Sequence, residues 1–575
     1  MRAGPHRIAR LALAAALLCF AVSPARAITI SILNNDSPGE GFNDPTPAAP
    51  VGGNNGTTVG QQRLNCFQEA ANIWSSLLPG PGIVQISAQF DPLDCTATSA
   101  VLGSAGPIWV NANFPNAPYT GHWFNGAEVN NLMGIDDDPS DPEIDATFNS
   151  NLGQAGCLTG VSFYYGFDGK EGANIDLLAV LLHEFGHGLG FLTVTDETSG
   201  QQCCGSTLHP AAWDKYLLDT NTGLHWDAET NGQRAASAIN TGKLVWDGPS
   251  VTTWAPSFQG PKPKLHVNSP GGIAGDYLSG TASFGPAIST TPVSGNVVLV
   301  NDGVGTVTDG CEAPFTNAGA IAGKIALIDR GTCTFVTKVK NAQNAGAIGV
   351  IVVNDVAGTP PTGMSGNDPT ITIPSVRISL ADGNTIKANL GTGVNVTLVA
   401  DATKLAGADA AGHMMVFTPN PVQPGSSVSH WDVSATPNLL MEPAINADLN
   451  SSGDPRRKVD LTYQLMGDIG WIPVSAGVPA GGGAAQVQLA SVPNPAHGNA
   501  TLHFDLASDE DVSLAVYDMS GRKVRALASG RFTAGTHDVA WDGLDAHGHP
   551  AAAGVYLALL KGSRTHVTQH IVLLN

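Results

Sequence analysis

The residues of this chain that are best suited to do chemistry are His183, Glu184 and His187, in the run His-Glu-Phe-Gly-His. Residues four positions apart lie on one face of a helix, so both imidazoles can bind the same ion. Glu184 is rotated by about 100° around the helix, where it reaches a water beside that ion without being a ligand. Zn²⁺ polarises a scissile carbonyl and lowers the pKa of water, and a nearby carboxylate takes the proton. The pattern therefore predicts zinc-dependent hydrolysis with Glu184 as general base.

The segment 175–191 that carries these residues is apolar at nearly every position. It is expected to form a helix buried on most sides, with Asn174 or Asp176 available to cap its start. Two core histidines satisfied by hydrogen bonds are the alternative interpretation. That alternative leaves the carboxylate of Glu184 buried without a partner, which is costly, so the metal site is favoured.

The motif continues as Gly-Leu-Gly-Phe and resembles the H-E-x-x-H-x-x-G sequence of the metzincin metallopeptidases. In that family the glycine ends the helix and turns the chain toward a third ligand, and Gly190 matches it. The usual third His or Asp would stand at position 193, which is Thr193 in this chain, and Asp196 lies three residues later. The ordinary metzincin pattern is therefore incomplete in this stretch.

A later part of the chain resembles the leishmanolysin branch of the metzincins, in which a long insertion displaces the third histidine. The matching segments are S-H-W-D at 429–432, N-L-L-M-E-P at 438–443 and D-I-G-W at 468–471. The resemblance implies that His430 is the third metal ligand and that Met441 is the methionine of the Met-turn. It also implies that the last of these segments belongs to the closing helix.

Other residues compete with His430 for the third position. His209 is the leading alternative, and Asp196 is close to the motif in sequence. A third ligand of glutamate type would have to be Glu197 or Glu229, and neither has a supporting sequence context.

The amino-terminal sequence predicts export. Three arginines precede an apolar run at 11–22, and Ala-Arg-Ala at 25–27 has small residues where signal peptidase reads the chain. The run is shorter than the ~20 residues that a membrane span needs, and no later segment reaches that length. We expect a signal peptide that is cleaved after Ala27, a secreted or cell-surface location in a bacterium, and no transmembrane span.

The cysteines are consistent with an oxidising compartment. Without Cys19 of the signal peptide, seven of the eight cysteines remain, so at least one is unpaired. The local pairs that we expect are Cys66 with Cys95 and Cys311 with Cys333, which leaves Cys157 for Cys203 or Cys204.

The composition excludes a single small module and argues against a nucleic-acid partner. The chain has 575 residues, enough for several domains, and its net charge of −21 repels phosphate backbones. Charged residues make up only 13%, whereas glycine (68) and proline (38) are frequent, as in sheet-rich and loop-rich proteins. Protein or peptide substrates fit this surface better than nucleic acid does.

Between the motif and His430, the segment 323–354 predicts a strand, a helix and a second strand. It resembles the protease-associated domain of secreted peptidases, in which Cys311 and Cys333 stand at positions suited to a disulfide. In that family the domain is thought to bind or gate peptides. A dinucleotide-binding fold is excluded because no G-x-G-x-x-G opens the helix.

The last part of the chain follows a linker at 476–485 that contains no side chain able to anchor a core. Short alternating runs at 513–517 and 554–560 then predict a small β-sandwich. The tail resembles the immunoglobulin-like C-terminal domains of bacterial exported proteins, including flagellar hook-capping-type and type IX sorting domains. Contact with secretion machinery or the cell surface follows from that resemblance, and a carbohydrate-binding or adhesive sandwich is the alternative.

Two acidic stretches could hold Ca²⁺. Asp136, Asp137 and Asp138 stand near Asp141, although a solvated acidic turn explains them better. The segment 448–459 resembles half of an EF-hand loop but lacks its closing glutamate.

These observations predict a multidomain protein with an α+β metzincin-like catalytic domain, an α/β protease-associated insertion and an all-β Ig-like sandwich. The expected divisions are a signal peptide (1–27), the first catalytic part (28–270), the insertion (271–405), the second catalytic part (406–471), a linker (472–486) and the sandwich (487–575). The leading hypothesis is a secreted zinc metalloendopeptidase. Its rivals are a non-catalytic surface-binding protein that keeps the zinc fold and a zinc hydrolase for a non-peptide bond.

Overall fold

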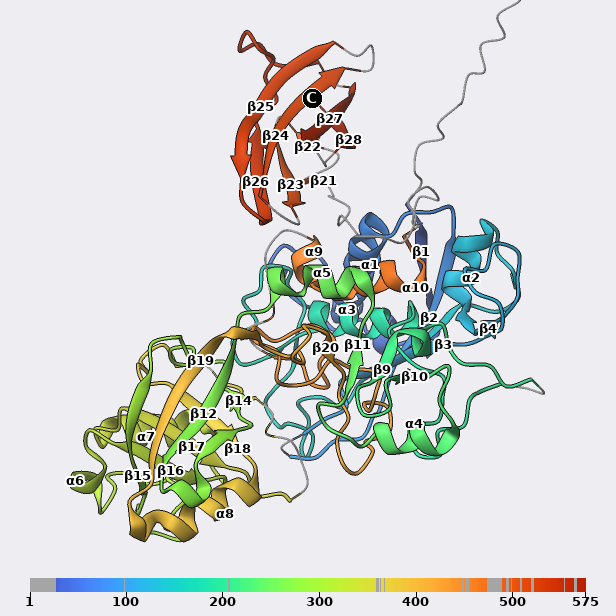
Figure 1. Cartoon of the computed structure of the whole chain (residues 1–575). Helices are drawn as coiled ribbons and strands as arrows, with labels where there is room; N and C mark the ends of the chain where they lie inside the picture. The colour runs from blue at the N-terminus through green and yellow to red at the C-terminus, as the bar shows by residue number, and fades with distance from the viewer. Residues whose placement is uncertain are drawn as a thin grey trace, which may run out of the picture.

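A computed structural model of the chain divides into three units that are plain in Figure 1, with the insertion at the lower left and the C-terminal unit at the top. The structure describes residues 27–97, 99–204, 207–357, 361, 363–366, 368–446, 449, 455–472, 489–492, 496–497, 499–506, 509–518, 522–552, 554–562 and 566–574. The predicted signal peptide and nearly all of the predicted linker therefore lie outside the described residues. Among the helices that are described, none has the length and apolar character needed to cross a membrane.

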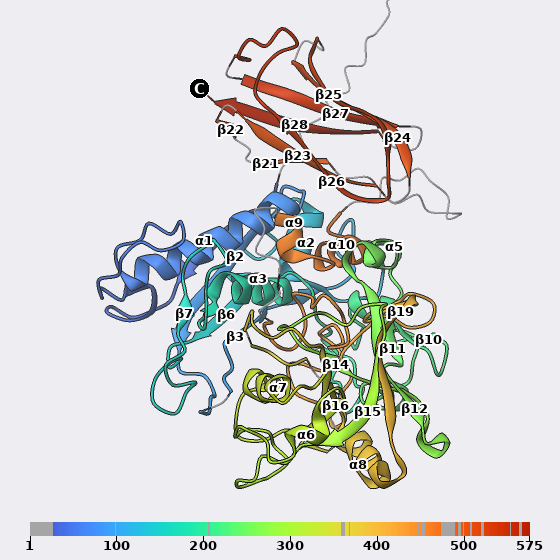
Figure 2. The same ribbon diagram turned by 90° about the vertical axis from the view of Figure 1, so that its left-hand side faces the viewer.

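The first unit is built on a four-stranded sheet in the order β1-β2-β6-β3. Its strands are β1 (Thr29–Asn34), β2 (Ile83–Asp91), β6 (Ile144–Asn149) and β3 (Gly103–Pro107). The first three run parallel, and β3 runs antiparallel to β6 at one edge. Two helices, α1 (Val59–Leu77) and α3 (Leu177–Gly188), lie side by side against this sheet (Figure 2).

Helix α1 forms because its sequence supplies both a cap and an apolar face. The hydroxyl of Thr58 accepts a hydrogen bond from the Gln61 N–H, which satisfies one of the free donors at the helix start. Phe67, Ala70, Ala71 and Trp74 are fully buried on one side, toward α3 and the sheet. The Trp74 indole donates to the Leu182 carbonyl at 3.2 Å, which ties α1 to α3.

The same hydrophobic core continues into a second half of this unit. Its second sheet has the order β10-β9-β11-β20, and β20 comes from the chain after the insertion. Pairing of Val245 with Met415 brings that returning chain back beside the chain that left for the insertion. The elements of this half are β9 (Leu217–Asp219), β10 (Leu224–His225), β11 (Leu244–Trp246), β20 (Met414–Met415), α4 (Asn231–Ser237), α5 (Pro249–Phe258), α9 (Pro455–Val459) and α10 (Thr462–Ile469). Smaller elements of the first half are α2 (Gly126–Met133), β4 (Val110–Asn111), β5 (Phe124–Asn125), β7 (Phe163–Tyr164) and β8 (Ile175–Asp176).

The insertion contains an eight-stranded mixed sheet in the order β13-β12-β19-β15-β16-β17-β18-β14. The predicted strand, helix and strand are β16 (Ile325–Asp329), α7 (Phe335–Asn344) and β17 (Gly349–Val353), and the two strands are parallel. The sheet also includes β12 (Pro261–Ser269), which precedes the expected start of the insertion at 271. The remaining elements are β13 (Gly275–Tyr277), β14 (Gly280–Thr281), β15 (Val293–Leu299), α6 (Ala318–Ile321), β18 (Ser375–Ile378), α8 (Leu380–Asn389) and β19 (Asn395–Leu405).

The C-terminal unit is a sandwich of two sheets with its own core. The sheet orders are β21-β23-β26 and β22-β28-β27-β24-β25. Its buried residues, among them Phe504 and Trp541, form a cluster separate from that of the first unit. The strands are β21 (Leu489–Val492), β22 (Ala496–His497), β23 (Ala500–Leu506), β24 (Glu510–Asp518), β25 (Lys523–Phe532), β26 (Gly535–Trp541), β27 (Gly554–Gly562) and β28 (His566–Leu574).

The disulfides agree with the sequence prediction at one pair and correct the others. Cys311 and Cys333 are joined, as expected. The predicted Cys66–Cys95 pair is wrong, because Cys95 is joined to Cys157 while the Cys66 thiol is free and buried in α1. The Cys66 thiol faces the core and donates to the Tyr165 carbonyl at 3.3 Å. Cys203 and Cys204 are joined to each other, so neither pairs with Cys157 as predicted.

Candidate metal centre

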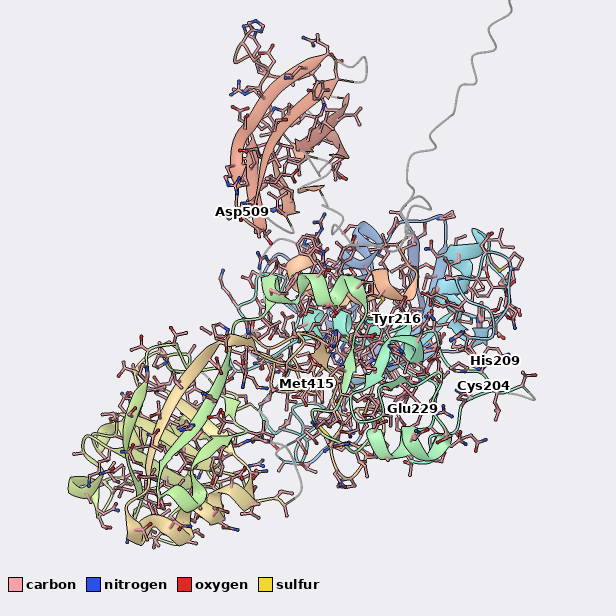
Figure 3. All side chains as sticks on the ribbon, viewed as in Figure 1. Cys204, His209, Tyr216, Glu229, Met415 and Asp509 are labelled. Carbon is pink, nitrogen blue, oxygen red and sulfur yellow. A yellow bond between two sulfur atoms is a disulfide. The ribbon has the colours of Figure 1, made fainter. Side chains whose placement is uncertain are left out.

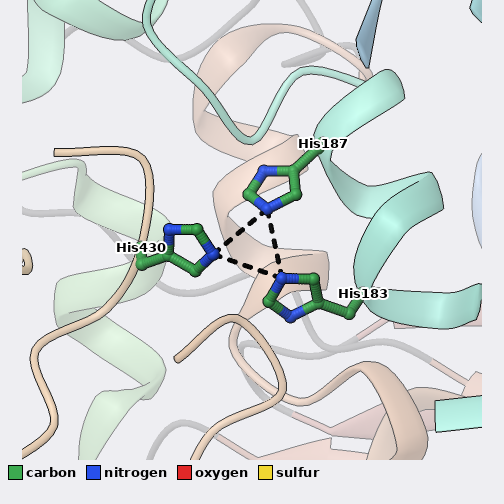
Figure 4. A group of neighbouring side chains, drawn as sticks. All are labelled: His183, His187 and His430. Atoms are coloured by element: carbon green, nitrogen blue, oxygen red, sulfur yellow. Dashed lines mark hydrogen bonds between the residues drawn. The ribbon is translucent and has the colours of Figure 1, made fainter. Parts of the chain in front are cut away.

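Three histidines from two distant parts of the chain converge at one point. His183 and His187 project from α3, and His430 comes from the loop that follows β20. The Nε2 atom of His187 lies 3.1 Å from that of His183 and 3.2 Å from that of His430, and the third Nε2 to Nε2 separation is 3.2 Å (Figure 4). All three side chains are buried, and they are one of the two groups of possible metal-ligating atoms among the described residues.

The other ring nitrogen of each histidine is held by a backbone carbonyl. Nδ1 of His183 donates to the Leu440 carbonyl at 2.7 Å, and Nδ1 of His187 donates to the Phe191 carbonyl at 2.8 Å. Nδ1 of His430 donates to the Ser426 carbonyl at 2.8 Å. A carbonyl only accepts, so each Nδ1 carries the proton and each neutral ring presents an Nε2 lone pair.

Burial keeps these rings neutral. It lowers the pKa of His183 to about 4 and that of His187 to about 3, since an imidazolium loses its hydration there. The pKa of His430 also falls well below its usual value for the same reason, with repulsion from the other two rings adding to the effect.

This arrangement fits a bound cation. Three lone pairs that face one another with no proton between them repel, and a positive ion at their centre removes that repulsion. Tetrahedral zinc with Zn–N distances of about 2.0–2.1 Å places its ligand nitrogens about 3.3–3.4 Å apart, close to the separations found here. The hydrogen bond from each Nδ1 to a carbonyl is also the usual outer support of a zinc-ligating histidine.

Local sequence explains why α3 presents its two histidines here. The Asp176 carboxylate accepts from the Leu178 N–H at 2.9 Å and caps the start of the helix. At its end, Gly190 has φ of 122°, and a side chain there would lie 2.7 Å from the Asn125 amide nitrogen. The Leu189 carbonyl, left free where the helix ends, accepts from the Trp471 indole at 2.7 Å. Position 190 therefore requires glycine for both its conformation and its close packing.

Burial of aromatic side chains brings His430 to the helix. The adjacent Trp431 is fully buried and contacts the Phe191 ring, with ring centroids 5.1 Å apart. Its backbone N–H donates to the Met441 carbonyl at 2.8 Å, and the His430 carbonyl accepts from the Phe417 N–H at 2.8 Å. Packing one residue away thus fixes the position of the ligand.

Met441 lies directly under the metal-binding turn of α3. It is fully buried, and a side chain at Gly186 would come within 2.9 Å of its sulfur. The glycine of His-Glu-Phe-Gly-His therefore makes room for Met441.

The Glu184 carboxylate is anchored to the edge strand β3. Its Oε2 accepts a hydrogen bond from the Ala105 N–H at 2.9 Å, and Oε1 accepts none from a described residue. A side chain at Gly103 would lie 3.2 Å from Cγ of Glu184, so this glycine allows the close approach. Burial raises the pKa of Glu184 to about 8, and the Ala105 hydrogen bond partly opposes that rise.

The competing third ligands all lie elsewhere. His209 packs against the Trp123 ring, with centroids 5.1 Å apart, and neither His209 nor Glu229 belongs to the group of converging ligand atoms; Figure 3 labels both residues. Asp196 is exposed and accepts from Ser199. Glu197 is not among the converging ligand atoms either. Position 193 has a structural role, because the Thr193 hydroxyl donates to the buried Asp214 carboxylate at 2.7 Å.

Calcium is not supported at the described acidic stretch. The Asp137 carboxylate accepts from the Asn111 amide, and that of Asp138 accepts from Ser140. The one acidic group that gathers among the described residues is Asp302, Asp309 and Glu312 in the insertion. The ligand positions of the half EF-hand, 448, 450 and 452, lie outside the described residues.

Sequence reasoning missed Asp460, which contacts the backbone of Leu440, the residue whose carbonyl holds His183. Its Oδ2 accepts from the Leu440 N–H at 2.5 Å, and the Leu440 carbonyl in turn holds His183. Asp460 is buried and also accepts from the Thr462 N–H at 3.3 Å at the start of α10. In a sequence, an Asp two residues before a helical Thr indicates only a helix cap. Nothing in the local sequence therefore predicted that Asp460 would also accept from the Leu440 N–H.

We expect Asp460→Ala to weaken zinc affinity by about 10–100-fold, because loss of an outer support lets the ligand ring reorient. Competition with a chromophoric chelator measures this affinity directly. Asp460→Asn keeps an acceptor for the Leu440 N–H, so its zinc affinity should lie between those of the wild type and Asp460→Ala. The control is Asp219→Ala, which removes an equally buried carboxylate that accepts from Asn221 far from the histidines. Equal zinc affinity in the wild type and Asp460→Ala would contradict the role given to Asp460.

A cavity of about 210 Å³ lies along helix α3, and its lining includes neither Glu184 nor any of the three histidines. It lies beside the first half of α3 and the Leu440 segment, and its other walls come from the loop 167–176 and from Ser365 of the insertion. Its apolar surface is formed by Leu102, Phe167, Ile175, Leu178, Ala179, Leu182, Leu440, Ile445 and Leu449. Polar and charged residues, among them Asp176, Asn446 and Lys458, share the walls, so the cavity is mixed in character.

Comparisons with known proteins identify two of the units. Residues 293–386 match the PA domain family, and residues 491–565 match the FlgD Ig-like domain family. The chain therefore contains a PA domain and an FlgD-type Ig-like domain, as the sequence predicted. Neither match includes the three histidines, so the family of the catalytic unit is not identified by these two models.

Whole-protein similarities are partial. Minor extracellular protease Vpr of Bacillus subtilis (strain 168) is 28% identical over 195 residues, which are 34% of this chain and 22% of that protein. An aminopeptidase of Pseudomonas aeruginosa (strain UCBPP-PA14) is 46% identical over 79 residues, 14% of each chain. The solved zinc aminopeptidase BSAP of Bacillus subtilis is 29% identical and covers 25% of this chain and 31% of its own, with a TM-score of 0.19. The chain thus spans less than a quarter of either curated relative.

Proposed function

We propose that the protein is a secreted zinc metalloendopeptidase of metzincin type that resembles the leishmanolysin branch. The observation that carries this proposal is the convergence of three neutral imidazole lone pairs beside a buried glutamate on the same helix. His183, His187 and His430 would hold the zinc ion, and Met441 would form the Met-turn beneath it.

Zinc at this centre would supply Lewis-acid polarisation of a peptide carbonyl and acidification of the attacking water. Residues of the chain would transfer the proton and orient the three imidazole rings. Glu184, held by the Ala105 N–H, presents its free Oε1 to accept a proton and later return it to the leaving amine. The carbonyls of Leu440, Phe191 and Ser426 keep the three rings in the tautomer that ligation needs.

An extended peptide has a natural docking edge beside this glutamate. Strand β3 pairs with β6 on one side only, and it carries the residue that anchors Glu184. A substrate that adds to this edge would be fixed by main-chain hydrogen bonds. The 210 Å³ cavity along α3 would then take one side chain of the substrate.

The remaining units support action on proteins outside the cytoplasm. The PA domain and the FlgD-type Ig-like domain accompany a predicted signal peptide and three disulfides. One partial relative is named an extracellular protease, and two are named aminopeptidases. A non-catalytic binding protein would need the three histidines but would have no use for the anchored Glu184.

Cleavage of an internal peptide bond tests the proposal. We expect the purified chain to cleave a peptide that is acetylated at its amino end and amidated at its carboxyl end. A zinc chelator should abolish cleavage and added zinc should restore it, because the reaction requires the ion. Mass spectrometry of the products locates the bond.

The unblocked version of the same peptide is the matched control. Release of single residues from its amino end, with no cleavage of the blocked peptide, would identify an aminopeptidase and contradict the endopeptidase proposal. Zinc binding without cleavage of either peptide would favour the binding protein.

A further inference from the structure

A second and larger cavity, of about 320 Å³, lies between the catalytic unit and the insertion. Met415 and Val433 line it from the catalytic unit, and Lys262 and Leu278 line it from the strands and loops of the insertion sheet. Figure 3 labels Met415 on the side of the catalytic unit that faces the insertion. This cavity is distinct from the one beside α3, and no residue lines both.

The catalytic side of this second cavity holds a carboxylate oxygen without a partner. Asp432 is only 5% exposed, and its Oδ1 accepts from the Ser434 N–H at 3.0 Å and from the Ser434 hydroxyl at 2.5 Å. Its Oδ2 is buried and has no hydrogen-bond partner among the described residues. A buried anionic oxygen left this way is costly, so it points to a donor that is supplied from elsewhere.

The insertion side of the cavity holds a lysine ammonium and a serine hydroxyl that also have no hydrogen-bond partner among the described residues. The cavity contains Lys262, Lys264 and Lys404. Lys264 pairs with Asp276 and Asp401, and Lys404 pairs with Asp401. Lys262 is half-buried, and it forms no hydrogen bond or ion pair with a described residue, although its charge acts on Asp432. The Ser279 hydroxyl is buried and also without a partner.

The cavity thus presents an unpartnered carboxylate oxygen, an unpartnered ammonium group and an unpartnered hydroxyl. Each needs a complement of opposite character. Leu278, Met415 and Val433 supply an apolar wall between them. Lys262 and Asp432 act on each other electrostatically, but no ion pair or hydrogen bond joins them, so each retains an unused hydrogen-bonding position.

We propose that this cavity binds a small zwitterion with an apolar side chain, namely a free α-amino acid or a dipeptide. The ligand ammonium would donate to Asp432 Oδ2 and Ser279 Oγ, and the ligand carboxylate would accept from Lys262 Nζ. The apolar side chain would lie against Leu278 and Val433. Because the ligand contacts both units, its binding would hold the insertion against the catalytic unit and stabilise the chain by mass action. This site does not depend on the proposed peptidase activity.

Isothermal titration calorimetry of the full-length chain with L-leucine tests the site. The two control ligands are 4-methylpentanoate, which lacks the ammonium, and isoamylamine, which lacks the carboxylate. We expect binding of L-leucine and at least tenfold weaker binding of both controls, since each leaves one charged group of the cavity unpaired. No binding of L-leucine, or equal binding of a control, would overturn the proposal.

Variants separate this site from the metal centre. Lys262→Met should weaken L-leucine binding at least tenfold and remove the rise in Tm that the ligand gives, whereas Lys404→Met should change neither, because Lys404 is already paired. Ser279→Ala should weaken binding less, by roughly threefold, as one neutral hydrogen bond is lost. Unchanged binding in Lys262→Met would place the leucine at another site and overturn the proposal.

A dipeptide arm identifies which zwitterion fits best. L-leucyl-L-leucine is titrated into Glu184→Gln, so that the peptide is not consumed. Tighter binding of the dipeptide than of L-leucine, with the same dependence on Lys262, assigns the cavity to short peptides. The reverse order assigns it to free amino acids.

Discussion

Replacing Glu184 with glutamine is expected to lower kcat by about 10²–10⁴-fold while the zinc content stays at about one ion per chain. The glutamine keeps the size of the side chain, and its amide oxygen can still accept from the Ala105 N–H. What is lost is the ability of the free oxygen to take a proton. The measurements are the rate of blocked-peptide cleavage and the zinc content by mass spectrometry.

The matched control for this change is Glu229→Gln. Glu229 is buried to a similar extent, 6% exposed against 8% for Glu184, but its carboxylate accepts from Thr222 away from the histidines. It should cleave peptide at the wild-type rate. A Glu184→Gln chain as active as the wild type would show that another group accepts the proton, and the proposed mechanism would be wrong.

His430→Ala should lose zinc as completely as His187→Ala, because a catalytic zinc needs three protein ligands and two imidazoles hold it far more weakly. Zinc bound per chain after dialysis should fall from about one to nearly none in both variants. The methyl group of alanine leaves the Trp431 packing in place, so circular dichroism should show the fold retained.

His209→Ala is the control, since His209 lies against Trp123 and outside the metal group. It should keep its zinc. If His430→Ala keeps zinc as well as the wild type does, then the convergence of the three rings is not a metal site, and the proposed function loses its main support.

Part of this site is predictable from sequence because it depends on local geometry. The spacing of four residues in His-Glu-Phe-Gly-His places two imidazoles on one helix face whatever the rest of the chain does. The apolar run around it and Asp176 before it predict the helix, which the structure places at Leu177–Gly188 with that Asp as its cap. A strand, helix and strand pattern predicted the insertion, alternating runs predicted the C-terminal sandwich, and both units match the domain families that they resemble.

Contacts across long separations were less predictable. The cysteines show this most clearly, because spacing favoured Cys66 with Cys95, whereas Cys66 lies on the buried face of α1 and Cys95 meets Cys157. Which thiols meet depends on how the strand-connecting loops fold back. Sequence separation contains little of that information.

The third histidine stands between these two cases. His430 was singled out by a family resemblance. The residues next to it in the sequence do not predict how close it lies to His187, which stands 243 positions earlier in the chain. Pairing of β11 with β20 and burial of Trp431 against Phe191 bring it there.

The sequence by itself determined which residue types the proposed chemistry would use, namely two histidines and a glutamate, and the helix that carries them, because residues a few positions apart keep a fixed geometry on a helix. The tertiary structure alone decided which distant groups support that chemistry. The Asp460 carboxylate behind Leu440, the Ala105 N–H on Glu184 and the Asp432 oxygen facing Lys262 are all contacts of this kind. The physical reason is that they arise when separate segments bury their apolar side chains in one core, and that burial is a property of the whole folded chain.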